Sequence, residues 1–181
     1  MTAGRAPAAD AARQGAGSPA DGVPEAELRR VAGEVPDPEL PMVTLAELGV
    51  LRDVRVLGPG RVEVELTPTY TGCPAIEVMA ADVTRRLRER GVTEVAVRTV
   101  LSPPWTTEAI SAEGRRKLAE AGIAPPRPMA AGGPVPVTLS VRCPHCGSLD
   151  TTLLSRFSST ACKALRRCES CREPFDHFKE L

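Results

Sequence analysis

Alternating hydrophobic and charged residues predict three β-strands in the first 100 residues of the chain. The clearest covers residues 61–66, where every second side chain is hydrophobic and the residues between are charged. This period of two is typical of a strand with one buried face. Similar patterns mark residues 50–57 and 93–100, and the turn at residues 58–60 joins the first two strands into a hairpin.

Hydrophobic residues at helical spacing predict three helices around these strands. The first covers residues 25–32, the second begins at Pro74 and runs to about residue 90, and Ser111 caps a third that ends at residue 121. Residues 44–49 form a helical turn or a short loop that ends at Gly49. The order helix, strand, strand, helix, strand favours an α+β fold, a small two-layer α/β sandwich on a mixed sheet.

The composition divides the chain into four parts. Residues 1–23 carry almost no hydrophobic side chains and predict a disordered tail, whereas residues 24–124 form the α+β domain. Residues 125–134 are a linker rich in proline and glycine. Residues 135–181 form a small C-terminal module that begins with a strand at residues 135–141.

Two pairs of cysteines, each separated by two residues, organise the C-terminal module. A chain with this spacing places four thiolates at the corners of a tetrahedron, so it predicts a zinc ribbon with structural zinc on Cys143, Cys146, Cys168 and Cys171. The alternative is two redox pairs or a disulfide clasp. His145 lies inside the first pair, either solvated or as an alternative ligand. Cys162 lies outside the two CxxC pairs. It is either a buried thiol of the ribbon or a second functional ligand.

A fifth candidate thiol, Cys73, lies between Gly72 and Pro74. Because proline favours the first helical position, we expect Cys73 at the N-cap, where the helix dipole lowers the pKa of a thiol. Cys73 is then a nucleophile or a metal ligand. The alternative is a small buried residue that only fills space.

Asp37 and Glu39 lie in a loop with prolines at positions 36, 38 and 41. Prolines stiffen the chain, so the two carboxylates are expected to point in fixed directions. The alternative is a connector with solvated acids. Trp105, the single tryptophan, is either a packing anchor or a site residue.

Charge and composition argue against several functions. The formal net charge is zero and aromatic residues make up 3% of the chain, which disfavours binding to nucleic acid. No hydrophobic stretch could span a membrane or act as a secretory signal, and the cysteine pattern suits a reducing cytosol, so we expect a cytoplasmic protein. Only His145 and His177 could pair with a catalytic cysteine.

Several motifs together resemble the PaaD family of phenylacetic acid degradation proteins (phenylacetate-CoA oxygenase PaaJ subunits), in which a SufT-like iron–sulfur cluster assembly domain precedes a zinc ribbon. The similar segments are residues 35–43, 45–51, 67–75, 105–107, 113–118, 122–126, 143–148, 159–165 and 173–179.

The resemblance implies a non-catalytic accessory protein for the multicomponent oxygenase that epoxidises phenylacetyl-CoA. It implies a role in iron–sulfur cluster or iron-centre assembly, with other oxygenase subunits, above all the reductase, as partners. Cys73 would hold a transient cluster, with Asp37 and Glu39 as ligands or partner contacts. One cysteine cannot hold a cluster alone, so a homodimer or the partner supplies further ligands, or Cys73 is a relay. The alternatives are a scaffold subunit that docks through the ribbon and a nucleic-acid-binding ribbon.

Overall fold

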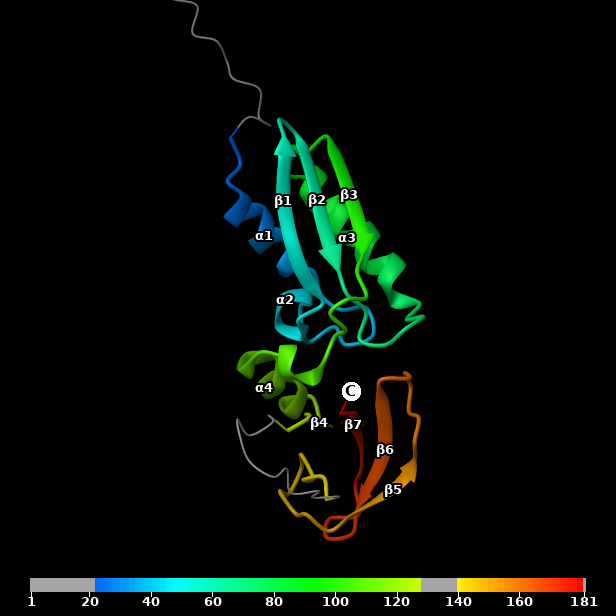
Figure 1. Ribbon diagram of the computed structural model, residues 1–181. Coiled ribbons are helices and arrows are strands. Elements are labelled where there is room, and N and C mark those ends of the chain that lie inside the picture. Colours follow the sequence, from blue (N-terminus) through cyan, green and yellow to red (C-terminus); the bar gives the residue numbers. More distant parts are fainter. Residues whose placement is uncertain (1–21, 128–139, 181) are drawn as a thin grey trace, which may run out of the picture.

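The computed structural model describes residues 22–127 and 140–180. Its N-terminal part is a three-stranded sheet of β1 (Leu51–Gly58), β2 (Arg61–Leu66) and β3 (Glu94–Thr99) in the order β1-β2-β3. β1 pairs with β2 antiparallel and β2 with β3 parallel. Helices α1 (Glu25–Gly33) and α3 (Ala75–Arg88) contact each other and lie on one face of the sheet (Figure 1). This arrangement confirms the predicted α+β two-layer sandwich.

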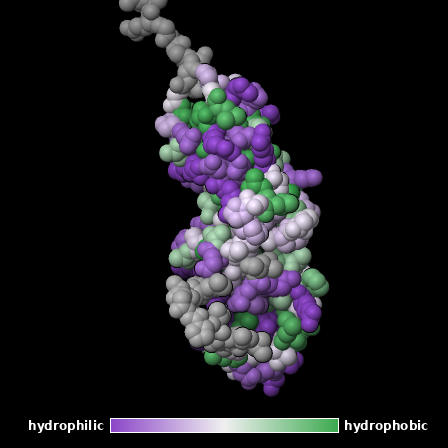
Figure 2. All heavy atoms as spheres, in the orientation of Figure 1, coloured by the Kyte–Doolittle hydropathy of each residue, from purple (hydrophilic) through white to green (hydrophobic). Residues whose placement is uncertain are grey.

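Hydrophobic side chains fill the space between these two layers. Val62, Val64 and Leu66 of β2 are buried, as their alternation predicted, and they lie in one core with Val83 and Leu87 of α3. The other face of the sheet is polar, and hydrophilic side chains cover most of the visible surface of this part (Figure 2). The sheet therefore has one buried face and one solvated face.

Charged side chains form ion pairs with one another on the solvated face of the sheet. Glu63, at the centre of β2, forms ion pairs with Arg55 at 3.0 Å and with Arg98 at 2.7 Å. The two arginines cover the Glu63 carboxylate, whose side chain is only 9% exposed. Charge pairing in place of hydrophobic packing is what the alternating sequence requires on this face.

Three short helical elements lie between the first sheet and a second one (Figure 1). The short helix α2 (Leu45–Leu48) has Thr44 as its N-cap, whose side chain accepts a hydrogen bond from the Glu47 amide at 3.3 Å. The 3-10 helix η1 (Thr107–Ala109) and α4 (Ala112–Glu120) follow β3, and the predicted cap of α4 is present, since the Ser111 hydroxyl accepts from the Gly114 amide at 2.9 Å.

The second sheet has the order β4-β7-β6-β5 and contains β4 (Ile123–Ala124), β5 (Thr151–Ser155), β6 (Lys163–Cys168) and β7 (Pro174–Phe178). β5, β6 and β7 pair antiparallel and form the ribbon, whereas β4 adds to β7 in parallel. Two residues are too few for a recognisable alternation, so the sequence did not predict β4. Most of the expected strand at residues 135–141 and most of the linker fall on residues 128–139, outside the described ranges, as does the tail up to residue 21.

The ribbon packs directly on the α+β domain. Phe178 at the end of β7 and Cys162 just before β6 belong to the same core as Trp105, Leu118 and the residues of the first sheet. The hairpin between β5 and β6 reaches toward the loops at the end of the first sheet (Figure 1). None of the helices in the described ranges is long and hydrophobic enough to cross a membrane.

Candidate metal centres

Two tight turns build a cluster of four thiols at the far end of the ribbon. In the first, the Gly147 amide donates to the Cys143 carbonyl at 2.9 Å; in the second, the Arg172 amide donates to the Cys168 carbonyl at 3.0 Å. Gly147 and Arg172 each adopt a left-handed backbone, with φ of 77° and 67°. Each turn thereby bends back so that both of its cysteines face one point.

The sulfur geometry fits a tetrahedral metal ion. The sulfur atoms of Cys143, Cys146, Cys168 and Cys171 all lie within 4.8 Å of one another. Cys143 and Cys171 are 3.8 Å apart, and Cys146 and Cys168 are 3.5 Å apart. Zinc–sulfur bonds of about 2.3 Å would place the corners of a tetrahedron about 3.8 Å apart. The Cys171 amide donates to the Cys168 sulfur and lowers the pKa of that thiol to about 6, which favours the ligating thiolate.

The other residues of the first turn are not part of this cluster. His145 is exposed, and its ring lies beside Gly122 rather than with the sulfurs. All six cysteines are free thiols, so neither CxxC pair forms a disulfide.

Cys73 lies before α3, not at its N-cap. The structure corrects the expected helix start: Pro74 is the N-cap and the helix begins at Ala75. The thiol is buried, with 6% of the residue exposed. Burial raises the pKa of Cys73, and hydrogen bonds from the Ala75 amide and the Tyr70 hydroxyl only partly offset that rise. The expectation of a lowered thiol pKa was therefore wrong, because desolvation exceeds the effect of the helix end.

Asp37 is held rigidly by its own loop. One oxygen of its carboxylate accepts the amides of Glu39 and Leu40, each at 2.8 Å. The Asp37 amide donates to the Val43 carbonyl at 3.0 Å, which closes the loop. Asp37 is only 4% exposed, and burial raises the pKa of its carboxyl. The alternative of a connector with solvated acids fails for Asp37, while Glu39 is half-buried.

A second thiol, Cys162 of the ribbon, lies in the same hydrophobic core as Cys73. Cys162 is 3% exposed, and its sulfur lies 3.0 Å from the Thr160 hydroxyl. Burial raises the pKa of Cys162, and the charges of Glu39 and Asp37 raise it further, while Lys163 lowers it. The same two carboxylates also raise the pKa of Cys73.

The structure thus places two thiols and two carboxylates in the region where the ribbon meets the α+β domain. Among the described residues, however, only the four ribbon cysteines form a group of three or more such side chains whose ligand atoms all lie within 4.8 Å of one another. We name the residues of the region between ribbon and domain the junction cluster; its members are Asp37, Glu39, Tyr70, Cys73, Cys162 and Lys163. Sequence reasoning missed Tyr70 and Lys163, because no spacing rule connects them to Cys73. The only signal in the sequence was a cysteine outside the CxxC spacing.

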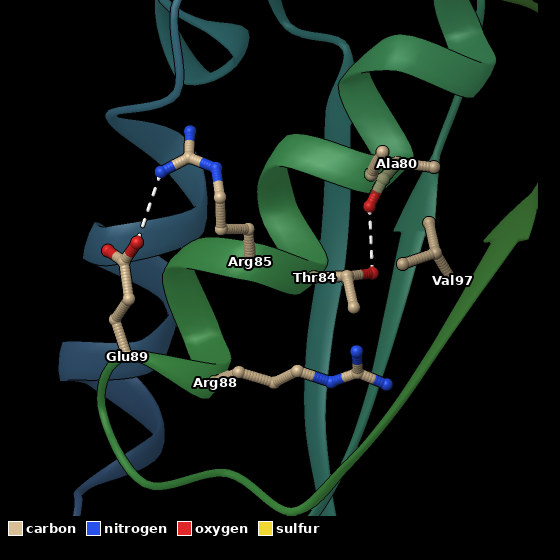
Figure 3. Close-up of a pocket in the computed structure, with 7 residues that line it drawn as sticks. Ala80, Thr84, Arg85, Arg88, Glu89 and Val97 are labelled. Carbon is tan, nitrogen blue, oxygen red and sulfur yellow. Dashed lines mark hydrogen bonds and ion pairs between the residues drawn. The ribbon is translucent and has the colours of Figure 1, made fainter.

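Trp105 is a packing residue and lies in the core between the two parts. It is 5% exposed, and its indole nitrogen donates to the Leu48 carbonyl at 2.9 Å. A separate cavity of about 710 Å³ lies on α3 and β3 (Figure 3). Thr84 bonds to the Ala80 carbonyl at 2.8 Å and Arg85 pairs with Glu89 at 3.1 Å, whereas Arg88, which also lines the cavity, has no hydrogen bond or ion pair with another described residue. Its residues come from the later turns of α3, so it is not the site of the thiols.

Comparison with known families agrees with this architecture. Residues 25–100 match the family described as iron–sulfur cluster assembly protein, and residues 133–179 match the PaaD zinc beta ribbon domain. The chain therefore combines an iron–sulfur assembly domain with a PaaD-type zinc ribbon.

Similarity to individual proteins extends over both parts. The chain is 45% identical over 153 residues to a protein of Escherichia coli K12 that is provisionally assigned to 1,2-phenylacetyl-CoA epoxidase as one of its subunits, covering 84% of this chain and 91% of that protein. The chain belongs to the PaaD family.

Two shorter proteins are similar to the first part. An iron–sulfur protein maturation auxiliary factor from Porphyromonas gingivalis is 32% identical over 95 residues, which are 52% of this chain and 90% of that factor. A crystal structure of a DUF59 domain of unknown function from Bacillus anthracis covers 52% of this chain and 90% of its own, with 31% identity and a TM-score of 0.49.

Proposed function

We propose that this protein is a non-catalytic maturation factor for the phenylacetyl-CoA epoxidase system, and that it assists assembly of an iron–sulfur cluster or iron centre in that complex. The similarity to the Escherichia coli protein supports the pathway, and the similarity to a maturation auxiliary factor supports the type of task. The partners are then the other epoxidase subunits, with the reductase as the client.

The observation that carries this proposal is the buried thiol of Cys73 beside two carboxylates on a rigid loop. Thiolate and carboxylate ligands together suit iron. Because burial raises the pKa of Cys73, the thiol stays protonated when no iron is bound, and iron must displace that proton to bind. Reprotonation then favours release, which suits a carrier whose cargo must leave.

We assign zinc to the four thiols at the far end of the ribbon. Cys143, Cys146, Cys168 and Cys171 would hold the ion with no position left for a substrate. Bound zinc would fix the two turns that the short β-strands alone stabilise weakly. The zinc therefore has a structural task, separate from the cargo.

The proposal is tested in cells that lack this protein. Complementation with wild type should restore both epoxidase activity and the iron and sulfide content of the purified reductase, whereas Cys73→Ser should restore neither. Ser159→Ala, a change at an exposed residue of the ribbon, is the matched control and should behave as wild type. Full reductase iron content in the Cys73→Ser strain would contradict the proposal.

A scaffold role is the second candidate function, because hydrophobic side chains are exposed on the ribbon. Leu153, Leu154 and Phe157 are 44%, 49% and 63% exposed. If docking is the whole task, Leu154→Asp with Phe157→Ser should abolish epoxidase activity, and Cys73→Ser should leave it unchanged.

A further inference from the structure

We propose that the free edge of β3 binds the same edge of a second copy of this chain, so that two three-stranded sheets join into one continuous sheet. The interface is built on β3 and on the groove that β3 forms with α3 (Figure 3). A strand at the edge of a sheet carries a row of unpaired amides and carbonyls, which is a template for another strand. This inference goes beyond the proposed function and does not depend on it, because none of its residues is assigned to a metal.

The backbone of β3 is open on one side. β3 forms one edge of the first sheet and, among the described strands, pairs only with β2 (Figure 1). The Glu94 and Val100 amides donate to carbonyls on the β2 side, at 2.9 and 2.8 Å. Because successive residues of a strand direct their amides to opposite edges, Val95, Val97 and Thr99 direct theirs to the free edge. Within residues 22–127 and 140–180, no hydrogen bond engages these three amides.

The opposite edge of the sheet, on β1, is protected by side chains. The Glu25 carboxylate accepts a hydrogen bond from the Val56 amide at 3.2 Å, and the Arg29 guanidinium donates to the Val54 carbonyl at 3.4 Å. The pairing of β1 with β2 is also irregular at two points, which discourages the approach of a further strand. The pairing of β3 with β2 is regular throughout, and β3 contains no proline or lysine. Of the two edges, β3 is therefore the one suited to strand pairing.

The charges of β3 are complementary to themselves. A two-fold dimer pairs the same edge with itself, so the two strands run antiparallel. With Ala96 on the two-fold axis, Glu94 of each copy lies opposite Arg98 of the other, on the exposed face of the sheet. Opposite charges directly across two strands stabilise their pairing, and moving the axis to Val95 or Val97 would remove both of these pairs. The charges thus favour a second copy as the partner and define the register.

Both charged side chains are accessible for this contact. Glu94 pairs with Arg61 at 3.0 Å, yet its side chain is 65% exposed. Arg98 pairs with Glu63 at 2.7 Å, yet its side chain is 68% exposed. Dimerisation would therefore link the ion pairs of the two copies into one network of alternating charges. Networks of this kind contribute more than isolated exposed pairs do.

The other face of β3 supplies hydrophobic contacts. Val95 and Val97 are half-buried. In this register, Val95 of each copy lies opposite Val97 of the other, in pairs that exchange backbone hydrogen bonds. Val97 points toward Ala80 and Thr84 of α3, beside the cavity of about 710 Å³ (Figure 3). Side chains of the second copy would cover this cavity.

Such a dimer would keep the two Cys73 thiols apart. Cys73 lies in the connection that leaves the end of β2, and β3 ends on the same side of the sheet because the two strands are parallel. In an antiparallel pair of β3 strands, these ends lie at opposite ends of the interface. The two copies would therefore not hold one cluster between their Cys73 residues.

The test is analytical ultracentrifugation of the full-length, zinc-loaded protein over a series of concentrations. Wild type is compared with Ala96→Arg, Glu94→Arg and Arg98→Glu, and with an equimolar mixture of the last two. Glu120→Arg, which changes the charge of α4 by the same amount as Glu94→Arg changes that of β3, is the matched control. All four substituted residues are exposed, and circular dichroism with zinc content establishes that each variant is folded.

We expect wild type and Glu120→Arg to form dimers in a proportion that rises with concentration. Ala96→Arg places two arginines together at the axis, and each of the other two variants places like charges opposite each other. Each of the three should raise the dissociation constant of the dimer at least about tenfold. The mixture of Glu94→Arg with Arg98→Glu should recover most of that loss, because opposite charges again face each other at both positions.

Two results would overturn the proposal. Wild type that stays monomeric at every concentration would do so, and this is the result expected if the edge of β3 binds a strand of a different protein. A wild-type dimer that Ala96→Arg leaves unchanged, or a mixture that dimerises no better than its two components, would place the interface elsewhere. Neither result would affect the role proposed for Cys73.

Discussion

The indole ring of Trp105 packs against the phenyl ring of Phe178, with ring centroids 5.9 Å apart and ring planes inclined by 49°. Trp105 follows the last strand of the α+β domain, and Phe178 ends the last strand of the ribbon. The contact therefore joins the two parts through a common core. With the ribbon packed in this way, the junction cluster and the four-thiol cluster lie at its opposite ends.

Phe178→Ala should loosen the junction. The ring is fully buried, and removal of a buried phenylalanine side chain costs about 3–5 kcal/mol of unfolding free energy. Denaturant unfolding measures the loss, and the fluorescence of the single tryptophan reports exposure of the junction at the same time. Phe178→Leu, which keeps most of the volume, should cost clearly less; equal losses in the two variants would show that the cavity is not the cause.

Removal of zinc should unfold the ribbon and leave the α+β domain folded. Wild type should carry about one zinc per chain, because four thiolates complete one tetrahedral site. Cys143→Ser should lose the metal, and a strong chelator should have the same effect. Elemental analysis gives the metal content and circular dichroism gives the structure. Cys162→Ser should keep its zinc, and loss of zinc in that variant would place Cys162 among the ligands.

The Glu47 carboxylate should make stability depend on pH. Burial opposes its charge, but hydrogen bonds from Lys117 at 2.7 Å and from the Thr44 amide outweigh burial and lower the pKa of Glu47. A lowered pKa contributes stability that is present above the unfolded value of about 4.3 and is lost as pH falls through the lower folded value.

Thermal unfolding of wild type and Glu47→Gln at a series of pH values tests this. The variant should be less stable at neutral pH, and the difference should shrink as the solution becomes acidic. Thr44→Ala, which removes the cap of α2, should cost about 1 kcal/mol. A stability difference for Glu47→Gln that is constant with pH would contradict the ion pair.

Iron affinity should rise with pH. Burial raises the pKa of Cys73, so near neutral pH this thiol must release a proton to bind iron. Each released proton makes affinity rise by about tenfold per pH unit below the thiol pKa. Tyr70, whose pKa burial raises to about 12, keeps its proton, and Asp37 and Glu39 are the charged groups that act on the Cys73 thiol.

Anaerobic iron titrations between pH 7 and about 9 measure the slope, since thiols titrate in this range. Wild type should release about one proton per iron, from Cys73, and Cys73→Ser should release none. A slope near zero in wild type would mean that no thiol binds the iron.

The sequence predicted most of the α+β domain because hydrophobic and charged residues alternate along its strands and recognisable residues mark where its helices begin and end. β2 and the Ser111 cap follow directly from such local patterns. The CxxC spacing likewise predicted the sulfur cluster, since both turns are local. The strand β4 and the junction cluster could not be predicted, because they depend on contacts between residues far apart in the chain.

Cys73 shows how local reasoning fails at a site. Its position before a helix suggested a lowered pKa, but burial, together with the charges of Glu39 and Asp37, raises the pKa instead. The burial of a single side chain depends on the packing of distant segments, and so does its pKa. Tyr70 and Lys163 escaped prediction for the same reason.

The central claim is that Cys73 handles iron for cluster assembly. Its most direct test is the iron and acid-labile sulfide content per chain of protein purified without oxygen, compared between wild type and Cys73→Ser. The account predicts iron in wild type, a clear loss of that iron in Cys73→Ser, and unchanged zinc in both. Equal iron and sulfide in the two proteins would contradict it.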